Sequence, residues 1–158
     1  MRLPDVSSIC AELFEQLSEM AYSAVVNEIG LARIERNAEE AKDSDPLNFL
    51  FIKAAASCIK GDEELCRKYH LQAIAFEARV ESYYNFAVSL SRLGRLLESL
   101  EYVQKAMYLA PTDERLAEFK KSLLDRIEDQ MWDDMDNDTD DFLTEVCMSS
   151  FHIGDAHA

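Results

Sequence analysis

Seven side chains in this sequence have the chemistry of nucleophiles, bases or soft metal ligands: Cys10, Cys58, Cys66, Cys147, His70, His152 and His157. No two cysteines have the CxxC spacing that is typical of zinc and redox sites. The two C-terminal histidines lack a nearby cysteine or carboxylate arrangement that would complete a metal cage. The GxSxG, P-loop and HExxH motifs are also missing from the sequence. We therefore expect a protein that is not an enzyme and that carries no cofactor or metal.

Acidic side chains alternate near the C-terminus in a spacing that could chelate calcium: Asp134, Asp136, Asp138, Asp140 and Glu145. An EF-hand calcium loop needs oxygen ligands at alternating positions, with a bidentate glutamate at its end. It also needs glycine at its sharp turn and an apolar anchor two residues later, where this chain has Thr139 and Asp141. The mismatch favours a solvated acidic segment over a calcium site.

Charge is distributed unevenly along the 158 residues, whose net charge is −15. All 16 lysines and arginines precede residue 127, and the remaining segment holds ten acidic residues. We therefore expect 132–158 to be an acidic, flexible tail, which could also attract a basic partner. No basic stripe could contact phosphates, so nucleic acid is not an expected partner. No apolar run is long enough to cross a membrane.

Helices would have to position the cysteine, histidine and acidic side chains named above, because apolar and small residues recur at helical spacing along the chain. Between Val80 and Asp113 the sequence places apolar, small and turn residues at Tyr83, Phe86, Ala87, Leu90, Gly94, Ser99, Val103, Ala106 and Pro111. In this pattern it resembles a tetratricopeptide repeat, in which two antiparallel helices form a hairpin. Such a hairpin cannot bury its apolar side alone, so it must stack on neighbouring hairpins.

Fainter copies of this pattern precede it. A step of 33 residues towards the N-terminus relates Ala87 to Ala54, and Gly94 to Gly61. The spacing predicts repeats at about 13–46, 47–79 and 80–113, followed by a capping helix at 114–131. The expected fold is all-α, a short right-handed solenoid of stacked hairpins over residues 1–131.

The resemblance also implies which residues line a groove, because the first helix of each hairpin faces the concave side. Carried across residue by residue, the groove positions are Asn48, Phe51, Ala55, Cys58, Glu81, Tyr84, Val88 and Ser91. In the first repeat, where the register is open by one residue, they are Gln16, Glu19, Ser23 and Val26. Phe51 could instead pack against adjacent helices. His70 falls where the repeat packs an aromatic side chain, so we expect it in the core.

The expected function is therefore a non-enzymatic adaptor or chaperone that binds an apolar segment of another protein, and a homodimer is possible. The architecture resembles that of class II chaperones of type III secretion, which hold apolar segments of translocator proteins. The alternative is an acidic inhibitor, similar to an antitoxin, that neutralises a basic partner through its tail. The cysteines, together with a start that has no apolar leader, predict a cytoplasmic protein. Lys53 occupies an apolar position, so we expect it to extend to water or to pair with an acid in the neighbouring repeat, such as Glu19.

Overall fold

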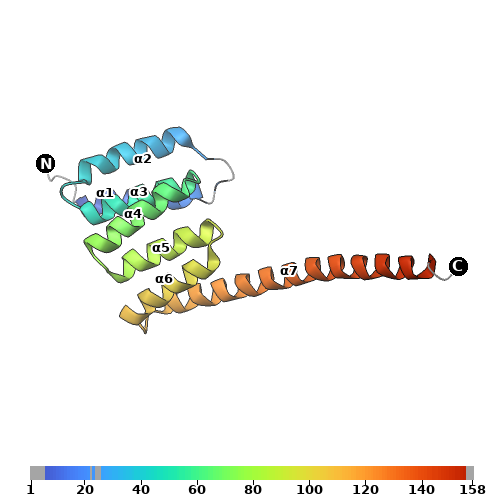
Figure 1. Cartoon of the computed structure of the whole chain (residues 1–158). Coiled ribbons are helices and arrows are strands. Elements are labelled where there is room, and N and C mark those ends of the chain that lie inside the picture. The colour runs from blue at the N-terminus through green and yellow to red at the C-terminus, as the bar shows by residue number, and fades with distance from the viewer. Residues whose placement is uncertain (1–5, 22, 24–25, 156–158) are drawn as a thin grey trace.

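The computed structural model describes the backbone of residues 6–21, 23 and 26–155, and the side chains of 12, 13, 15–21, 23 and 26–135. Within these residues the chain forms seven α-helices and no strand, so the predicted all-α fold is confirmed. In chain order they are α1 (Val6–Ala21), α2 (Glu28–Ala41), α3 (Pro46–Ile59), α4 (Glu63–Phe76), α5 (Val80–Arg92), α6 (Leu96–Leu109) and α7 (Glu114–Asp155), as Figure 1 shows. None of the described helices is both long and apolar enough to span a membrane.

Aspartates fix the starts of the two helices in the middle hairpin. Asp45 accepts a hydrogen bond from the N–H of Asn48 at 3.3 Å, and Pro46 opens the first turn of α3. Proline is tolerated there because its missing N–H would have no partner within the helix. Asp62 caps α4 in the same way, accepting from the N–H of Leu65 at 3.0 Å. Both caps satisfy donors that the helix leaves unpaired.

The turns at Gly61 and Gly94 have the same geometry. Each glycine has φ of 77°, a left-handed conformation that side chains with a Cβ rarely adopt. In both turns the N–H of the following residue donates to the carbonyl five residues earlier, at 3.0 Å and 2.8 Å. The two turns are 33 residues apart in the sequence. The recurrence of glycine therefore corresponds to a recurrence of backbone structure.

The helices pack as neighbouring hairpins. α3 pairs with α4 and α5 pairs with α6, while α3 also contacts α1, α2 and α5. Small side chains allow the two helix backbones of a hairpin to approach closely. The alanines at these positions are fully buried: Ala54 and Ala73 in one hairpin, and Ala87 and Ala106 in the other. Ser99 fixes the second hairpin further by donating to the Ala87 carbonyl at 2.6 Å.

Two apolar clusters form most of the core. The first joins α1, α2 and α3 through buried residues that include Leu13, Leu17, Leu31, Ile34 and Ile52. The second joins α5, α6 and α7 through Ala87, Leu96, Val103, Ala106, Leu116 and Leu123. α7 thus covers the apolar face that α5 and α6 would otherwise expose to water.

α7 is longer than the capping helix predicted from the sequence. It does not end at 131, and its backbone remains helical to Asp155. Figure 1 shows that its second half extends past the other helices. The acidic positions 134–145 therefore have helical backbone and not the turn that a calcium loop needs, and their side chains from 136 onward lie outside the described residues. The flexibility expected of 132–158 stays a prediction.

Lys53 pairs with an acid, but not with Glu19. Its Nζ lies 3.0 Å from Oε1 of Glu35 in α2, and Lys60 contacts the other carboxylate oxygen. The side chains of Lys53 and Glu35 are only 17% and 15% exposed, so Lys53 does not extend to water. Burial raises the pKa of Glu35, but the hydrogen bonds from the two lysines outweigh it and leave that pKa below its ordinary value. This pairing ties α2 to α3.

Candidate functional site

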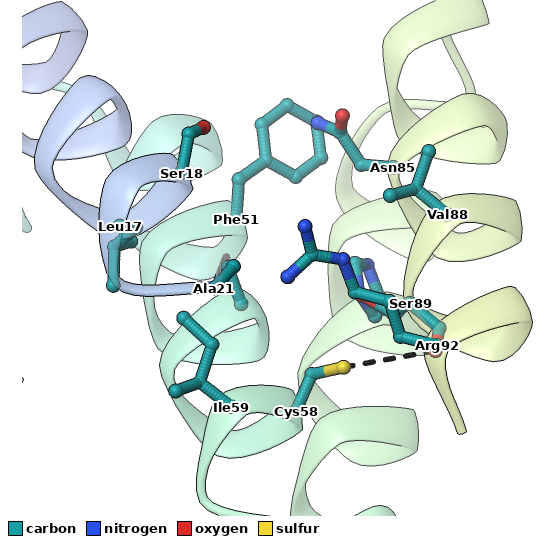
Figure 2. Close-up of a pocket in the computed structure, with 12 residues that line it drawn as sticks. Leu17, Ser18, Ala21, Phe51, Cys58, Ile59, Asn85, Val88, Ser89 and Arg92 are labelled. Carbon is teal, nitrogen blue, oxygen red and sulfur yellow. Dashed lines mark hydrogen bonds between the residues drawn. The ribbon is translucent and has the colours of Figure 1, made fainter. Parts of the chain in front are cut away.

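A pocket of about 130 Å³ opens between α1, α3 and α5. We call it the groove pocket, and twelve residues line it: Leu17, Ser18, Ala21, Phe51, Ala55, Cys58, Ile59, His70, Asn85, Val88, Ser89 and Arg92. Figure 2 shows α1 and α5 on either side, with Phe51 between them. Most of the lining side chains come from the first helix of a hairpin, and α4 adds only His70.

Four of the predicted groove residues meet at this pocket. Phe51, Ala55 and Cys58 come from successive turns of α3, and Val88 faces them from α5 (Figure 2). Phe51 and Cys58 are almost fully buried, so they form the pocket's inner wall. Ala55 and Val88 are half-buried and are thus open to an incoming group.

The other four predicted residues of α3 and α5 lie elsewhere. Tyr84 packs edge-on against Phe119 of α7, with 5.5 Å between ring centroids. Ser91 is buried, and Arg126 of α7 donates to its hydroxyl and, at 3.2 Å, to its carbonyl. Asn48 and Glu81 line a separate depression near the starts of α3 and α5, and Glu81 is exposed. α7 therefore covers the part of α5 that the sequence predicted to be open groove.

In α1, residues one or two positions from those expected face the pocket. Leu17, Ser18 and Ala21 line it, whereas Gln16 and Glu19 do not. Ser23 and Val26, which were also predicted, line an adjoining depression that shares Ala21, Cys58, Ile59 and Arg92 with the groove pocket. The small register error places apolar side chains on this wall where the sequence predicted polar ones.

Polar groups form a buried layer at the back of the pocket. His70 is 1% exposed, as the sequence predicted for a core residue, and its Nε2 lies 2.7 Å from Oγ of Ser89. Its ring stacks on Phe86 at 4.9 Å. The other ring nitrogen, Nδ1, is buried and has no hydrogen-bond partner. Burial lowers the pKa of His70 to about 3, so the imidazole is neutral at physiological pH.

Two thiols belong to the same layer. Cys58 donates to the Ser89 carbonyl at 3.6 Å (Figure 2), and this bond joins α3 to α5. The hydrogen bond with Cys66 lowers the pKa of Cys58, with help from Ser89 and the charge of Arg92, and these effects outweigh burial. The same thiol pair, together with burial, raises the pKa of Cys66. Both cysteines are buried and reduced, as expected for small core side chains.

Arg92 is a pocket residue that the sequence analysis missed. Among the described residues that line the pocket, it alone carries a charge, and Figure 2 shows it reaching from α5 towards Phe51 and Ala21. Arg92 lies four residues after Val88, so the helical spacing could have identified it. Asn85, three residues before Val88, was also missed, because it is not among the groove positions that the resemblance implies.

This arrangement is suited to binding. The walls offer apolar surface, while the Arg92 guanidinium and the Asn85 amide can donate hydrogen bonds to a bound segment. Among the described residues, no group of three His, Cys, Asp or Glu side chains could hold a metal ion. Comparison of the chain with protein-family models, with curated proteins and with solved structures found no match.

Proposed function

We propose that this protein is a non-enzymatic interaction module, an adaptor or chaperone, that binds an apolar peptide or helix of a partner protein in the groove pocket. The fold proposed for it is a right-handed tetratricopeptide solenoid with repeats at 13–46, 47–79 and 80–113. The matching turns at Gly61 and Gly94 support such a repeat, as does the contact between α3 and α5, the first helices of successive hairpins.

One observation carries the proposal: apolar side chains from three separate helices converge on a single opening that also holds a cationic group. A volume of about 130 Å³ is of the order that accommodates a benzene-sized group. The pocket is thus suited to one leucine or aromatic anchor, with Arg92 and Asn85 placed to contact the polar backbone beside it. Tyr84 does not line this pocket, and its ring packs edge-on against Phe119.

The test is capture of partners from a native lysate by the tagged wild-type protein and by Val88→Glu, followed by mass spectrometry. The substitution places a charged side chain in the apolar wall, where it can also pair with Arg92 four residues later, so we expect the captured proteins to be lost. Ile29→Glu is the matched control, since Ile29 is 86% exposed on α2 and does not line the pocket. Circular dichroism should show that all three proteins keep the same helical content.

A captured protein should then be cut into overlapping peptides and titrated calorimetrically. The proposal requires the binding peptide to contain an apolar anchor whose replacement by serine removes binding. Equal capture by wild type and Val88→Glu would show that the groove pocket is not the binding site. The alternative inferred from sequence, an acidic inhibitor, rests on residues 132–158 and stays a prediction.

A further inference from the structure

Large apolar side chains lie exposed where α6 meets the middle of α7. They are Leu97 of α6, which is 71% exposed, and Leu124, Met131, Trp132 and Met135 of α7, which are 44%, 62%, 59% and 56% exposed. We call these five residues the α7 patch. Leu97 and Met131 line one hollow together with Ile127. Leu124, Met131 and Met135 are seven and four residues apart, so they share one face of the helix.

This face differs from the one that attaches α7 to the body. Leu116, Phe119, Leu123 and Ile127 pack into the cluster with α5 and α6, and Ile127 is the last residue of α7 in that cluster. The helix nevertheless continues to Asp155, beyond the other helices in Figure 1. Exposed apolar side chains that gather in this way typically mark an interaction surface.

Around Met131, Trp132 and Met135 the charge on α7 has one sign. Glu128, Asp129, Asp133 and Asp134 flank its residues on α7, and all four are exposed. The sequence from 127 to the end contains no lysine or arginine. Of the basic groups nearby, Arg95 contacts the hollow but is paired with Glu63 at 3.0 Å. A ligand for this surface must therefore combine apolar side chains with positive charge.

That requirement selects one occupant. A second copy of the chain would bring another segment of ten acidic residues against the first, and like charges at close range repel. An anionic membrane surface would be repelled for the same reason. We propose that the α7 patch binds a basic amphipathic helix of a partner protein, with its apolar side on Leu97, Met131 and Trp132 and its cationic side chains on the flanking acids. This surface is separate from the groove pocket.

Trp132 provides a direct assay because it is the single tryptophan of the chain. The probe is a synthetic peptide of about 18 residues, helical, with leucine at one face, lysine at the other and no aromatic residue. Titration of the full chain with this peptide should shift the Trp132 emission to shorter wavelength and should saturate. Raising the salt from about 50 mM to about 500 mM should weaken binding at least about tenfold, because the charges on both sides become screened.

Variants of the protein and of the peptide distinguish binding at the α7 patch from nonspecific electrostatic attraction. The double variant Leu97→Gln with Met131→Gln should weaken binding at least about tenfold, whereas Ile29→Gln, which removes an exposed side chain from α2, should not change it. Val88→Glu, which disables the groove pocket, should also leave the affinity unchanged. A scrambled peptide with the same lysines but no apolar face should bind at least about tenfold more weakly.

Three results would overturn the proposal. The first is equal affinity for the amphipathic and the scrambled lysine peptides, which would mean unspecific charge attraction. The second is equal binding of a glutamate-for-lysine version of the peptide, which would mean that charge does not select the partner. The third is dimerisation of the chain alone, measured by sedimentation, with Trp132 emission that shifts as the dimer forms. That result would identify a second copy as the occupant.

Discussion

Replacing His70 by phenylalanine should remove much of the loss of stability that this fold undergoes in mild acid. The imidazole is 1% exposed, stacks on Phe86 and keeps a pKa of about 3 because burial disfavours its charged form. In the unfolded chain the same group takes up a proton near pH 6.5. Between these two values the unfolded state binds more protons than the folded state, so stability falls as the pH falls.

The magnitude follows from the two pKa values. Between pH 7 and pH 5 the protonation of His70 in the unfolded chain should lower the free energy of unfolding by about 2 kcal/mol. With a urea dependence of about 2 kcal/mol per molar, typical of a domain of this size, the midpoint should move by about 1 M. The variant His70→Phe should lack this contribution, because phenylalanine binds no proton in either state.

The assay is urea unfolding followed by circular dichroism at pH 7, 6 and 5, for wild type and His70→Phe. The quantity compared is the change in the free energy of unfolding between pH 7 and pH 5 within each protein. A loss of stability that is the same at every pH, such as that from the broken contact between residue 70 and Ser89, therefore cancels. Ser89→Ala is the control: it removes the hydroxyl 2.7 Å from Nε2 but leaves the imidazole buried, so the pH dependence should persist. If wild type and His70→Phe lose the same free energy between pH 7 and 5, the account of His70 as a buried neutral base is wrong.

Two further substitutions test the packing. Glu35→Gln removes the shared partner of Lys53 and Lys60, so it should cost about 1 to 3 kcal/mol in urea unfolding; the exposed neighbour Glu40→Gln should cost less than about 0.5 kcal/mol. Leu123→Ala should cost about 2 to 5 kcal/mol because Leu123 is fully buried in the α5–α6–α7 cluster. Leu124→Ala, at a position that is 44% exposed, should cost much less, and equal losses at 123 and 124 would contradict the packing of α7.

The features that could be predicted from the sequence are those that local chemistry determines. Gly61 and Gly94 are glycines because both turns need a positive φ, and Asp45 before Pro46 combines two residue types that are favoured at a helix start. Such signals depend on a few adjacent residues, so they can be recognised without knowledge of the fold. The all-α class follows from them together with the helical spacing of the apolar residues.

The features that could not be predicted depend on which helices become neighbours. Lys53 finds Glu35 of α2 and not Glu19 of α1, and this choice reflects how α2 crosses α3. Arg126 contacts Ser91, which is 35 residues away in the sequence, and no local sequence pattern predicts this contact. The extent of α7 was also missed, because the acidic run after 131 resembles a solvated tail in composition while its backbone is helical.

Positions 33 residues apart show how the neighbouring helix decides what a groove residue does. Cys58 and Ser91 are equivalent by this spacing, and each bonds to the next helix on the same side: Cys58 to Ser89 of α5, and Ser91 to Arg126 of α7. The bonds from Arg126 therefore tie α7 to the end of α5, while the main packing partner of α7 is α6. Ser91 is thereby held by α7 and does not line the groove pocket.

Phe51 and Tyr84 are equivalent in the same way, yet Phe51 lines the groove pocket and Tyr84 does not. Beside Tyr84, α7 supplies Phe119, whose ring packs edge-on against it with 5.5 Å between centroids. Beside Phe51, α5 lines the pocket with Asn85, Val88, Ser89 and Arg92, and none of these four side chains carries an aromatic ring. An aromatic contact therefore occupies Tyr84, whereas the wall that α5 presents to Phe51 leaves the opening in which we propose that an apolar anchor binds.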